Sequence, residues 1–485
     1  MPPEHLRFGG GTAETAIHPL VAMYLLIAIV MIFVLPRGKA ITPFLLAFFT
    51  IPIGQVLVLG GIHFTALRIL ILAGLARRAI FRRSSSESEG KYPGRFNGVD
   101  WAVILWTVSA AIIFCLEFTE TPAFIKSMGD LLDNLGGYLV VRFLIPDGEA
   151  MRRTFKTLAA ICAILGICMI NEQISHINVF GLVGGISSAV TVRAGQIRSA
   201  GTLGCLYAGV FAGVWIPLFL WLWADGKSRM VACVGLAGAT AMVITSNSST
   251  SWLALMGSLI GLAFWRLRKR MRVIRWGLVL GLVALHLVMK APVWALIARI
   301  DLTGSSSGQQ RFGLLDMTIR HFSDWWLLGT PEYVNWGWDS WDLCNQFVAV
   351  ALTGGLLTLI FYIAIFKRSF GAIGTARKLV DGDRGQEWLL WCLGSSLFAN
   401  VVAHFGINYM AQLIMGFFPL VACISVATFE ATQARVRTTE APTQVQLAPA
   451  PGAERTYPPF GEAKQEVPNS PAARGTERFT SWLKA

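Results

Sequence analysis

Apolar stretches recur along almost the whole chain, separated mostly by short polar connections. Most are close to the twenty or so residues that a membrane-spanning helix needs. None shows the strict alternation of a transmembrane β-strand, so the pattern predicts helices, the other structure that satisfies the backbone inside a bilayer. The predicted spans are residues 19–35, 41–60, 62–76, 101–118, 124–145, 157–175, 203–223, 230–245, 251–265, 276–289, 343–366, 387–404 and 408–428.

The composition agrees with a membrane protein. Hydrophobic residues make up 54% of the chain and charged residues 14%, and the mean hydropathy is +0.57, which excludes an ordinary soluble domain. We therefore predict an all-α, polytopic integral membrane protein with about 12–13 transmembrane helices. The stretches 62–76 and 124–145 contain charged residues, so either could be half-buried or partly interfacial. These charges are Arg68, and then Lys126, Asp130, Asp133 and Arg142.

Lysine and arginine are concentrated in alternate connections, which by the positive-inside rule face the cytoplasm. The formal charge of +13 is then mostly a matter of topology, and we expect no nucleic-acid partner. The first apolar run lacks a small-residue cleavage site and is followed by Arg37 and Lys39, so no cleavable signal peptide is expected. The cationic connections contain Arg77, Arg78, Arg82, Arg83, Lys91 and Arg95; Arg152, Arg153 and Lys156; Arg266, Arg268, Lys269, Arg270 and Arg272; and Lys367, Arg368, Arg377 and Lys378.

The C-terminal segment has a different composition from the rest. Residues 431–485 are rich in Pro, Ala, Thr, Gln and Glu and lack apolar periodicity, which is typical of disorder. We predict a membrane domain over residues 1–430, including an outer loop at 291–342, followed by a disordered cytoplasmic tail. The eight cysteines are scattered singly, without metal or redox spacing.

Two long connections fall on the predicted outer face, at residues 174–202 and 291–342. The second has about fifty residues, whereas structureless loops longer than about 12–15 residues are uncommon. Both contain arginines, which are depleted on that face. The segment RAGQIRSAGTLG holds Arg193 and Arg198, and the second connection holds Arg299, Arg311, Arg320 and His321.

These arginines have two explanations. Each could pair with a carboxylate, or extend to lipid phosphates. Alternatively, several could converge on a diphosphate, because guanidinium stays charged and matches phosphate oxygens with a planar fork of donors. The available carboxylates are Glu172, Asp301, Asp316, Asp324 and Glu332.

Aromatic and polar side chains gather where the second connection re-enters the membrane. An interfacial aromatic belt accounts for some of the tryptophans, but carboxylates at a helix entrance need a wet or paired setting. Rings beside carboxylates and amides also suit a carbohydrate, because rings stack on sugar C–H faces while polar groups bond hydroxyls. The residues are Trp325, Trp326, Trp336, Trp338 and Trp341, with Asp339, Asp342 and Asn345.

The order of these motifs resembles the superfamily of bacterial O-antigen ligases and O-antigen polymerases, over roughly residues 68–429. The resemblance rests on RSAGTLG opening a span, the turn TSNSSTS, then QQRFGLLDMTIRHFSDWWLLG before a short WGW segment, and NQFVAVALTGGLLTLIFYIAIF. In the ligases a histidine and a polar residue open the last of these spans, followed by a glycine and a small or hydroxyl residue. The corresponding positions are Cys344, Asn345, Gly355 and Thr358.

The resemblance implies a glycosyltransferase in the bacterial inner membrane with its active face in the periplasm. It would transfer glycan from an undecaprenyl-diphosphate carrier to a sugar hydroxyl, in O-antigen or exopolysaccharide synthesis. Its expected partners are the lipid-linked oligosaccharide, membrane lipids, and flippase and chain-length regulator proteins. No nucleotide-sugar or Mg²⁺ motif is present, and we expect no cofactor and no metal.

The predicted site combines catalytic and substrate-binding residues. We assign Asp342 and Asn345 to catalysis, with Asp342 as base or orienter of the acceptor hydroxyl. We assign Arg193, Arg198, Arg311, Arg320, His321, Trp338 and Trp341 to substrate binding.

Cys344 departs from the ligase pattern, which has histidine at that position, and favours a polymerase over a ligase. His321 and His404 are weaker substitutes, since His404 lies in an apolar span and fits a packing or helix-bridging role better. Two other classes remain open: a polysaccharide or lipid transporter, and a non-catalytic subunit of a polysaccharide assembly system.

Overall fold

The computed structural model describes residues 15–59, 62–82, 96–193, 195–299, 307–337, 340–410 and 412–440. Asp301, Trp338 and Asp339, together with most of the predicted tail, lie outside the described residues, as does the side chain of Arg299. Chain contacts define one unit over Met1–Thr438 and a second over Thr439–Ala485. The predicted boundary after residue 430 falls inside a helix, because α16 continues to Glu440.

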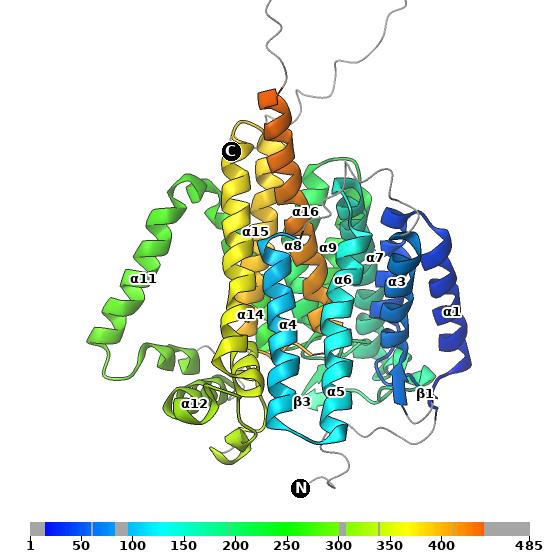
Figure 1. The fold of residues 1–485 in the computed structure, drawn as a ribbon, viewed down its shortest axis with the longest axis horizontal. Coiled ribbons are helices and arrows are strands. Elements are labelled where there is room, and N and C mark those ends of the chain that lie inside the picture. Colours follow the sequence, from blue (N-terminus) through cyan, green and yellow to red (C-terminus); the bar gives the residue numbers. More distant parts are fainter. Residues whose placement is uncertain are drawn as a thin grey trace, which may run out of the picture. The chain divides into compact units, whose positions relative to one another are not determined.

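The described chain is mostly helical, with two short β-hairpins (Figure 1). The α-helices are α1 (Pro19–Val34), α2 (Ile41–Thr50), α3 (Ala66–Arg82), α4 (Gly98–Glu117), α5 (Thr121–Leu131), α6 (Gly137–Leu144), α7 (Gly148–Ser175), α8 (Ala208–Ala224), α9 (Arg229–Thr245), α10 (Ser249–Ala263), α11 (Met271–Val288), α12 (Ser307–Arg320), α13 (Phe322–Trp325), α14 (Gln346–Leu379), α15 (Arg384–His404) and α16 (Gln412–Glu440). The strands β1 (Val56–Leu59) and β2 (Ile62–Thr65) pair antiparallel, as do β3 (Thr191–Arg193) and β4 (Gln196–Arg198).

Within the described residues, five helical segments are long and apolar enough to cross a membrane: Gly98–Glu117, Gly148–Ser175, Ser249–Val288, Gln346–Leu379 and Gln412–Ala434. Three shorter apolar helices accompany them, at Pro19–Val34, Ala208–Ala224 and Arg229–Thr245. The chain is therefore a helical membrane protein, as the hydropathy pattern predicts. The count of 12–13 spans stays a prediction.

Two predicted spans are interrupted by the first hairpin. Helix α2 ends at Thr50, and the rest of the 41–60 stretch forms a turn and β1, while 62–76 begins as β2. The Gln55 side chain organises this region: its amide nitrogen donates to the carbonyls of Val183 and Gly184 at 3.0 and 2.8 Å, and its oxygen accepts from His18 N at 2.8 Å. Apolar periodicity cannot predict such long-range bonds.

The stretch 124–145 is also irregular. It consists of α5, a π-helical turn at Leu132–Gly136, and α6. Arg68 forms a bidentate pair with Asp133 on this turn, with N–O distances of 2.9 and 3.0 Å. The charges that marked 62–76 and 124–145 in the sequence thus partly neutralise each other.

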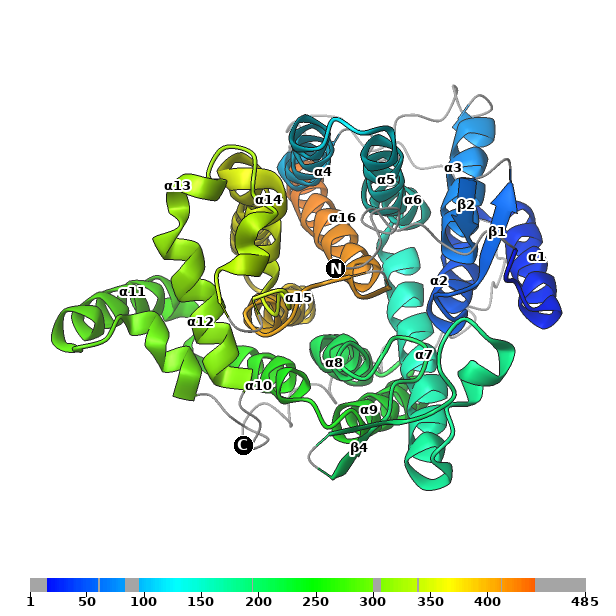
Figure 2. The ribbon, with the colours of Figure 1, turned by 90° about the horizontal axis from the view of Figure 1, so that it is seen from below.

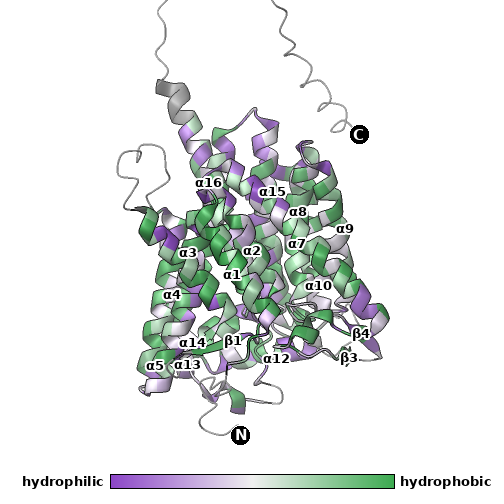
Figure 3. Ribbon diagram, turned by 90° about the vertical axis from the view of Figure 1, so that its right-hand side faces the viewer, coloured by the Kyte–Doolittle hydropathy of each residue, from purple (hydrophilic) through white to green (hydrophobic). Residues whose placement is uncertain are grey.

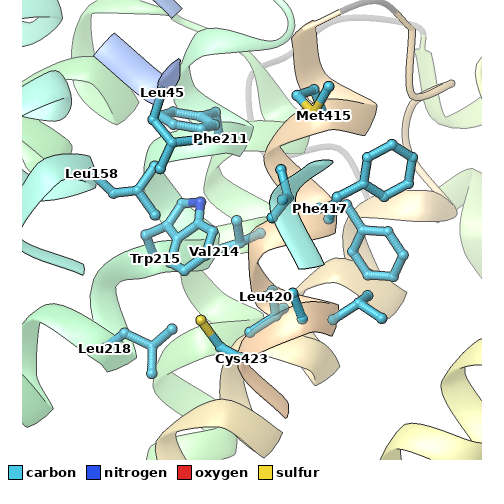
Figure 4. Packing of buried hydrophobic residues seen from close by; sticks show 14 of the residues in the cluster. Leu45, Leu158, Phe211, Val214, Trp215, Leu218, Met415, Phe417, Leu420 and Cys423 are labelled. Atoms are coloured by element: carbon cyan, nitrogen blue, oxygen red, sulfur yellow. The ribbon is translucent and has the colours of Figure 1, made fainter. Parts of the chain in front are cut away.

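The core is centred on α8, which is apolar and buried on nearly all sides. Figure 4 shows Phe211 and Trp215 of α8 near Leu158, with Phe417 and Leu420 of α16 on the other side. Helices α7 and α9 come close because small residues face each other, and a Cβ on Gly166 would lie 2.7 Å from the carbonyl oxygen of Gly238. Helix α11 runs apart from the other helices in Figures 1 and 2, and its apolar side chains are exposed.

The two ends of the bundle differ, and both are more polar than the middle in Figure 3. At one end Arg268 and Arg377 both bond the Glu387 carboxylate, at 3.0 and 2.9 Å, and Arg152 pairs with Asp225. These arginines belong to the connections predicted to be cytoplasmic, and the structure confirms that they share an end. Hairpins, α12 and α13 lie at the opposite end (Figures 1 and 3).

Candidate functional site

A pocket of about 360 Å³ lies at the hairpin end of the bundle. Three arginines line it, so we call it the arginine pocket: Arg193 and Arg198 from the β3–β4 hairpin and Arg311 from α12. Trp341 and Asp342, which precede α14, line it as well. The structure therefore brings together five of the nine predicted site residues, from two connections more than one hundred residues apart in the sequence.

The segment RSAGTLG is anchored to the membrane helices, and this fixes Arg198. The carboxylate of Glu172 on α7 accepts the backbone N–H groups of Ala200 and Gly201, at 2.9 and 3.0 Å. Ser199 N donates to the carbonyl of Thr245 at 3.0 Å, at the end of α9. Backbone donors to a carboxylate make strong bonds, so the segment is held from both sides.

The turn TSNSSTS between α9 and α10 forms hydrogen bonds with both the β3–β4 hairpin and α12. Asn247 has a positive φ of 43°, which asparagine tolerates better than most residues. Its side chain donates to the carbonyl of Ile197 in β4 at 2.7 Å. Thr250 accepts a hydrogen bond from Arg311 Nη2 at 3.0 Å and donates to the carbonyl of Gly406, also at 3.0 Å. One short polar turn therefore helps to position both Arg198 and Arg311.

The arginine pocket has an excess of positive charge. Arg198 and Arg311 are each only 7% exposed, and Asp342 is the single carboxylate among the described lining residues. Within the described part of the chain no ion pair of Arg198 is found, and the Glu172 carboxylate accepts the backbone N–H groups of Ala200 and Gly201. Burial lowers the pKa of Arg198, and the nearby charge of Arg193 lowers it further. A cation held in this way favours an anionic ligand.

Asp342 and Cys344, which precede α14, also line the arginine pocket. Gln310 donates from Nε2 to a carboxylate oxygen of Asp342 at 3.4 Å, and Cys344 N donates to the Asp342 carbonyl at 2.8 Å. Burial raises the pKa of the Cys344 thiol to about 11, and Asp342 raises it as well, while Arg311 acts in the other direction. The thiol is therefore protonated at neutral pH and is a poor base and nucleophile.

Asn345 and Gly355 of the proposed motif have local structural roles. Asn345 is buried and caps α14, since its side-chain oxygen accepts the N–H groups of Phe347 and Val348 at 2.9 and 3.3 Å. It does not line the arginine pocket. Gly355 breaks α14 with a φ of 65°, and a Cβ there would lie 2.5 Å from the carbonyl oxygen of Leu327. The break lets Leu356 N bond the carbonyl of Trp326 at 2.9 Å.

Arg320 and His321 are not brought to the arginine pocket. Arg320 pairs with Asp316 one turn earlier at 2.7 Å, and its side chain is 70% exposed. His321 forms a hydrogen bond with Asp324 at 3.0 Å, and this bond lowers the pKa of Asp324. The His321 ring also stacks on Trp336, with ring centroids 4.5 Å apart. The ion-pair explanation thus holds for Arg320 and His321 but not for Arg198.

Sequence reasoning missed several lining residues. Thr250 lies in the quoted TSNSSTS turn, but nothing in the sequence connects it with Arg311. Tyr207 and Asn408 also line the arginine pocket, and no pattern marks them. His404 bridges helices as predicted: Tyr362 OH lies 2.7 Å from its Nε2, and its Nδ1 lies 2.6 Å from the carbonyl oxygen of Asn400.

No protein-family model matches the chain, and no curated protein matches it at a significant level. The fold and the pocket define a helical membrane protein with a cationic, partly buried site at one end of its bundle. Any function must be argued from that site.

Proposed function

We propose that this chain is a membrane glycosyltransferase that transfers glycan from a polyprenyl-diphosphate carrier, undecaprenyl diphosphate in bacteria, to a sugar hydroxyl. The observation that carries the proposal is the convergence of Arg198 and Arg311, both buried, with Arg193 and a single carboxylate in one pocket. A lipid diphosphate carries its charge at the membrane surface, and the pocket lies at an end of the bundle, where that charge would be.

The arginines suit the donor side of such a reaction. Their N–H groups can bond the diphosphate oxygens in the ground state and stabilise the charge that grows on the leaving group. Burial strengthens this effect, because few water molecules compete for the same oxygens. Thr250 keeps the Arg311 guanidinium in a defined position, which favours a preorganised site.

Asp342 suits the acceptor side. An acceptor hydroxyl attacks the anomeric carbon of the donor sugar, and its proton passes to the Asp342 carboxylate. The bond between that carbon and the diphosphate oxygen breaks, and the electron pair leaves on the diphosphate beside the arginines. Burial raises the pKa of the Cys344 thiol to about 11, so Cys344 is a poor substitute for a histidine base, and Asp342 is the better candidate. The cysteine at this position, where the ligases have histidine, favours a polymerase over a ligase.

The arginine pocket would face the periplasm of a bacterial inner membrane, because the cationic connections gather at the other end. Flippase and chain-length regulator proteins would then act before and alongside the enzyme.

Reconstitution tests the proposal against its two alternatives. Purified protein in liposomes would receive a lipid-linked oligosaccharide extracted from the producing cells. An enzyme gives a longer or transferred glycan, a transporter gives movement of the carrier across the bilayer without bond exchange, and an assembly subunit gives neither. Transfer that disappears in Arg198→Ala at equal protein level supports the proposed site.

A further inference from the structure

A second pocket, of about 240 Å³, lies between α4, α5, α14 and the segment before α16. Leu343 and Asn408 line both this pocket and the arginine pocket, so the two adjoin. We call the second one the neutral pocket, because the two charged residues of its described lining, Lys126 and Asp130, form an ion pair. None of the predicted site residues lines it.

Two irregular stretches of backbone form its walls. Asn134 projects from the π-helical turn Leu132–Gly136, and its Nδ2 donates to the carbonyl of Asp130 at 2.9 Å. On the other side Thr353 and Thr358 flank the break at Gly355 in α14. Breaks and π-turns in helices are rare and frequently occur at functional sites. Thr358, the hydroxyl position of the motif quoted above, therefore lines this pocket, and the break at its glycine position, Gly355, lies between two lining residues.

The charges in the neutral pocket cancel. Lys126 and Asp130, one turn apart on α5, form an ion pair at 2.6 Å, and no other Lys, Arg, Asp or Glu is among its described lining residues. The arginine pocket, in contrast, has three arginines and one aspartate. An anion is thus favoured in one pocket and an uncharged ligand in the other.

The polar groups of the neutral pocket suit hydroxyl groups. Its lining includes amides and hydroxyls. The hydroxyls of Ser127 and Thr353 donate to backbone carbonyls, so their oxygens can still accept a hydrogen bond from a ligand. Asn408, on the shared wall, makes no side-chain hydrogen bond within the described part of the chain and is half-buried. Trp106 and Phe114 supply aromatic surface nearby. Amides with aromatic rings are better matched to a sugar than to a lipid tail, which offers no hydrogen bonds.

We propose that the neutral pocket binds the acceptor glycan, an uncharged polyhydroxylated chain end, beside the donor diphosphate. This inference rests on the proposed function. Asn408 would bond a hydroxyl of the acceptor sugar at the junction, where the reacting hydroxyl faces Asp342 and the donor carbon.

The test separates the two substrates. Asn134→Leu places an apolar side chain in the neutral pocket, and Asn408→Leu removes the amide from the shared wall. The matched control is Asn171→Leu, because Asn171 is an exposed asparagine on α7 that lines neither pocket. Transfer is measured in liposomes against acceptor and donor concentration, with protein level and gel-filtration profile recorded for each variant.

We expect Asn134→Leu and Asn408→Leu to raise KM for the acceptor about tenfold, as the loss of one or two hydrogen bonds would, with the donor KM unchanged. Asn171→Leu should match the wild type. A raised donor KM with an unchanged acceptor KM would mean that the neutral pocket holds part of the donor lipid, and this overturns the inference. Unchanged values for both substrates overturn it as well.

A binding measurement keeps the inference testable where a variant does not fold or the wild type shows no transfer. Thr353→Cys places a thiol in the neutral pocket, and its alkylation rate is followed by mass spectrometry. The probe is the free oligosaccharide released by mild acid from the lipid-linked glycans of the producing cells. Protection by this probe, but not by polyprenyl diphosphate, supports a glycan site even if the proposed transfer fails. Protection by polyprenyl diphosphate alone, or by neither, overturns it.

Discussion

Arg311 on α12 donates a hydrogen bond to the hydroxyl of Thr250 at the start of α10, with Nη2 and Oγ1 3.0 Å apart. Thr250 in turn donates to the carbonyl of Gly406, which follows α15. A residue of the long connection before α14 is thereby tied to two apolar helices. This link places a buried guanidinium in the arginine pocket with a defined orientation.

The first prediction concerns this link. Thr250→Val keeps the shape of the side chain but removes the hydroxyl, so Arg311 loses an oriented partner. We expect the rate of glycan transfer to fall about five- to tenfold, as one hydrogen bond to a charged group would suggest. Thr250→Ser, which keeps the hydroxyl, should stay within about twofold. Equal rates for the valine and serine variants would show that this bond does not position Arg311.

The second prediction concerns Asp342. Asp342→Asn should leave protein level and donor binding unchanged, because the arginines are intact, but it should lower transfer by about 100-fold, the size expected for a lost general base. Proteoliposome assays with donor binding measured in parallel check this. Normal glycan transfer by this variant at wild-type abundance would exclude Asp342 as the base.

The third prediction concerns the thiol of Cys344. Because its pKa is raised to about 11, the thiolate fraction should increase about tenfold with each pH unit up to that value. Alkylation of the Cys344 peptide, followed by mass spectrometry, should therefore still accelerate at pH 9.5. A plateau below pH 9, as for an ordinary exposed thiol, would contradict the buried environment. Cys344→Ser should retain transfer.

The fourth prediction concerns topology. Ser188 lies in the connection before β3, and Gln386 lies near the start of α15 at the opposite end; both are exposed. In intact spheroplasts an impermeant thiol reagent should label Ser188→Cys and should not label Gln386→Cys until the membrane is opened. The Cys-containing wild type serves as the background. Labelling of both from one side would refute the placement of the arginine pocket on the outer face.

The sequence predicts the helices well where apolar residues alone decide the structure, as in α8, whose side chains are buried on nearly all sides. It fails at the first hairpin, because Gln55 is held there by carbonyls more than one hundred residues away. The pattern of apolar residues along the chain cannot show such contacts.

The candidate site, like the fold, is predicted from the sequence only in part. From the sequence we assign Arg320 to substrate binding and Asn345 to catalysis, but Arg320 pairs with Asp316 on its own helix and Asn345 caps α14. The placement of Arg198 and Arg311 in one pocket depends on Glu172 and Thr250, which are distant in the sequence. For the same reason the sequence does not predict the neutral pocket, since it is formed by helices from three parts of the chain.

In the proposed reaction Arg198 and Arg311 hold the diphosphate of the donor. Binding of polyprenyl diphosphate to the purified protein is measured for the wild type, for Arg198→Ala and Arg311→Ala, and for the lysine variants of both. Arg320→Ala is the matched control, because this arginine is exposed and pairs with Asp316 outside the pocket.

We expect each alanine variant of the pair to weaken binding by about 10- to 100-fold, because it removes charge-assisted hydrogen bonds. Lysine should restore little, since it lacks the planar fork, and Arg320→Ala should bind as the wild type does. Wild-type affinity for polyprenyl diphosphate in both Arg198→Ala and Arg311→Ala, with the proteins folded, would exclude the two arginines as the donor site.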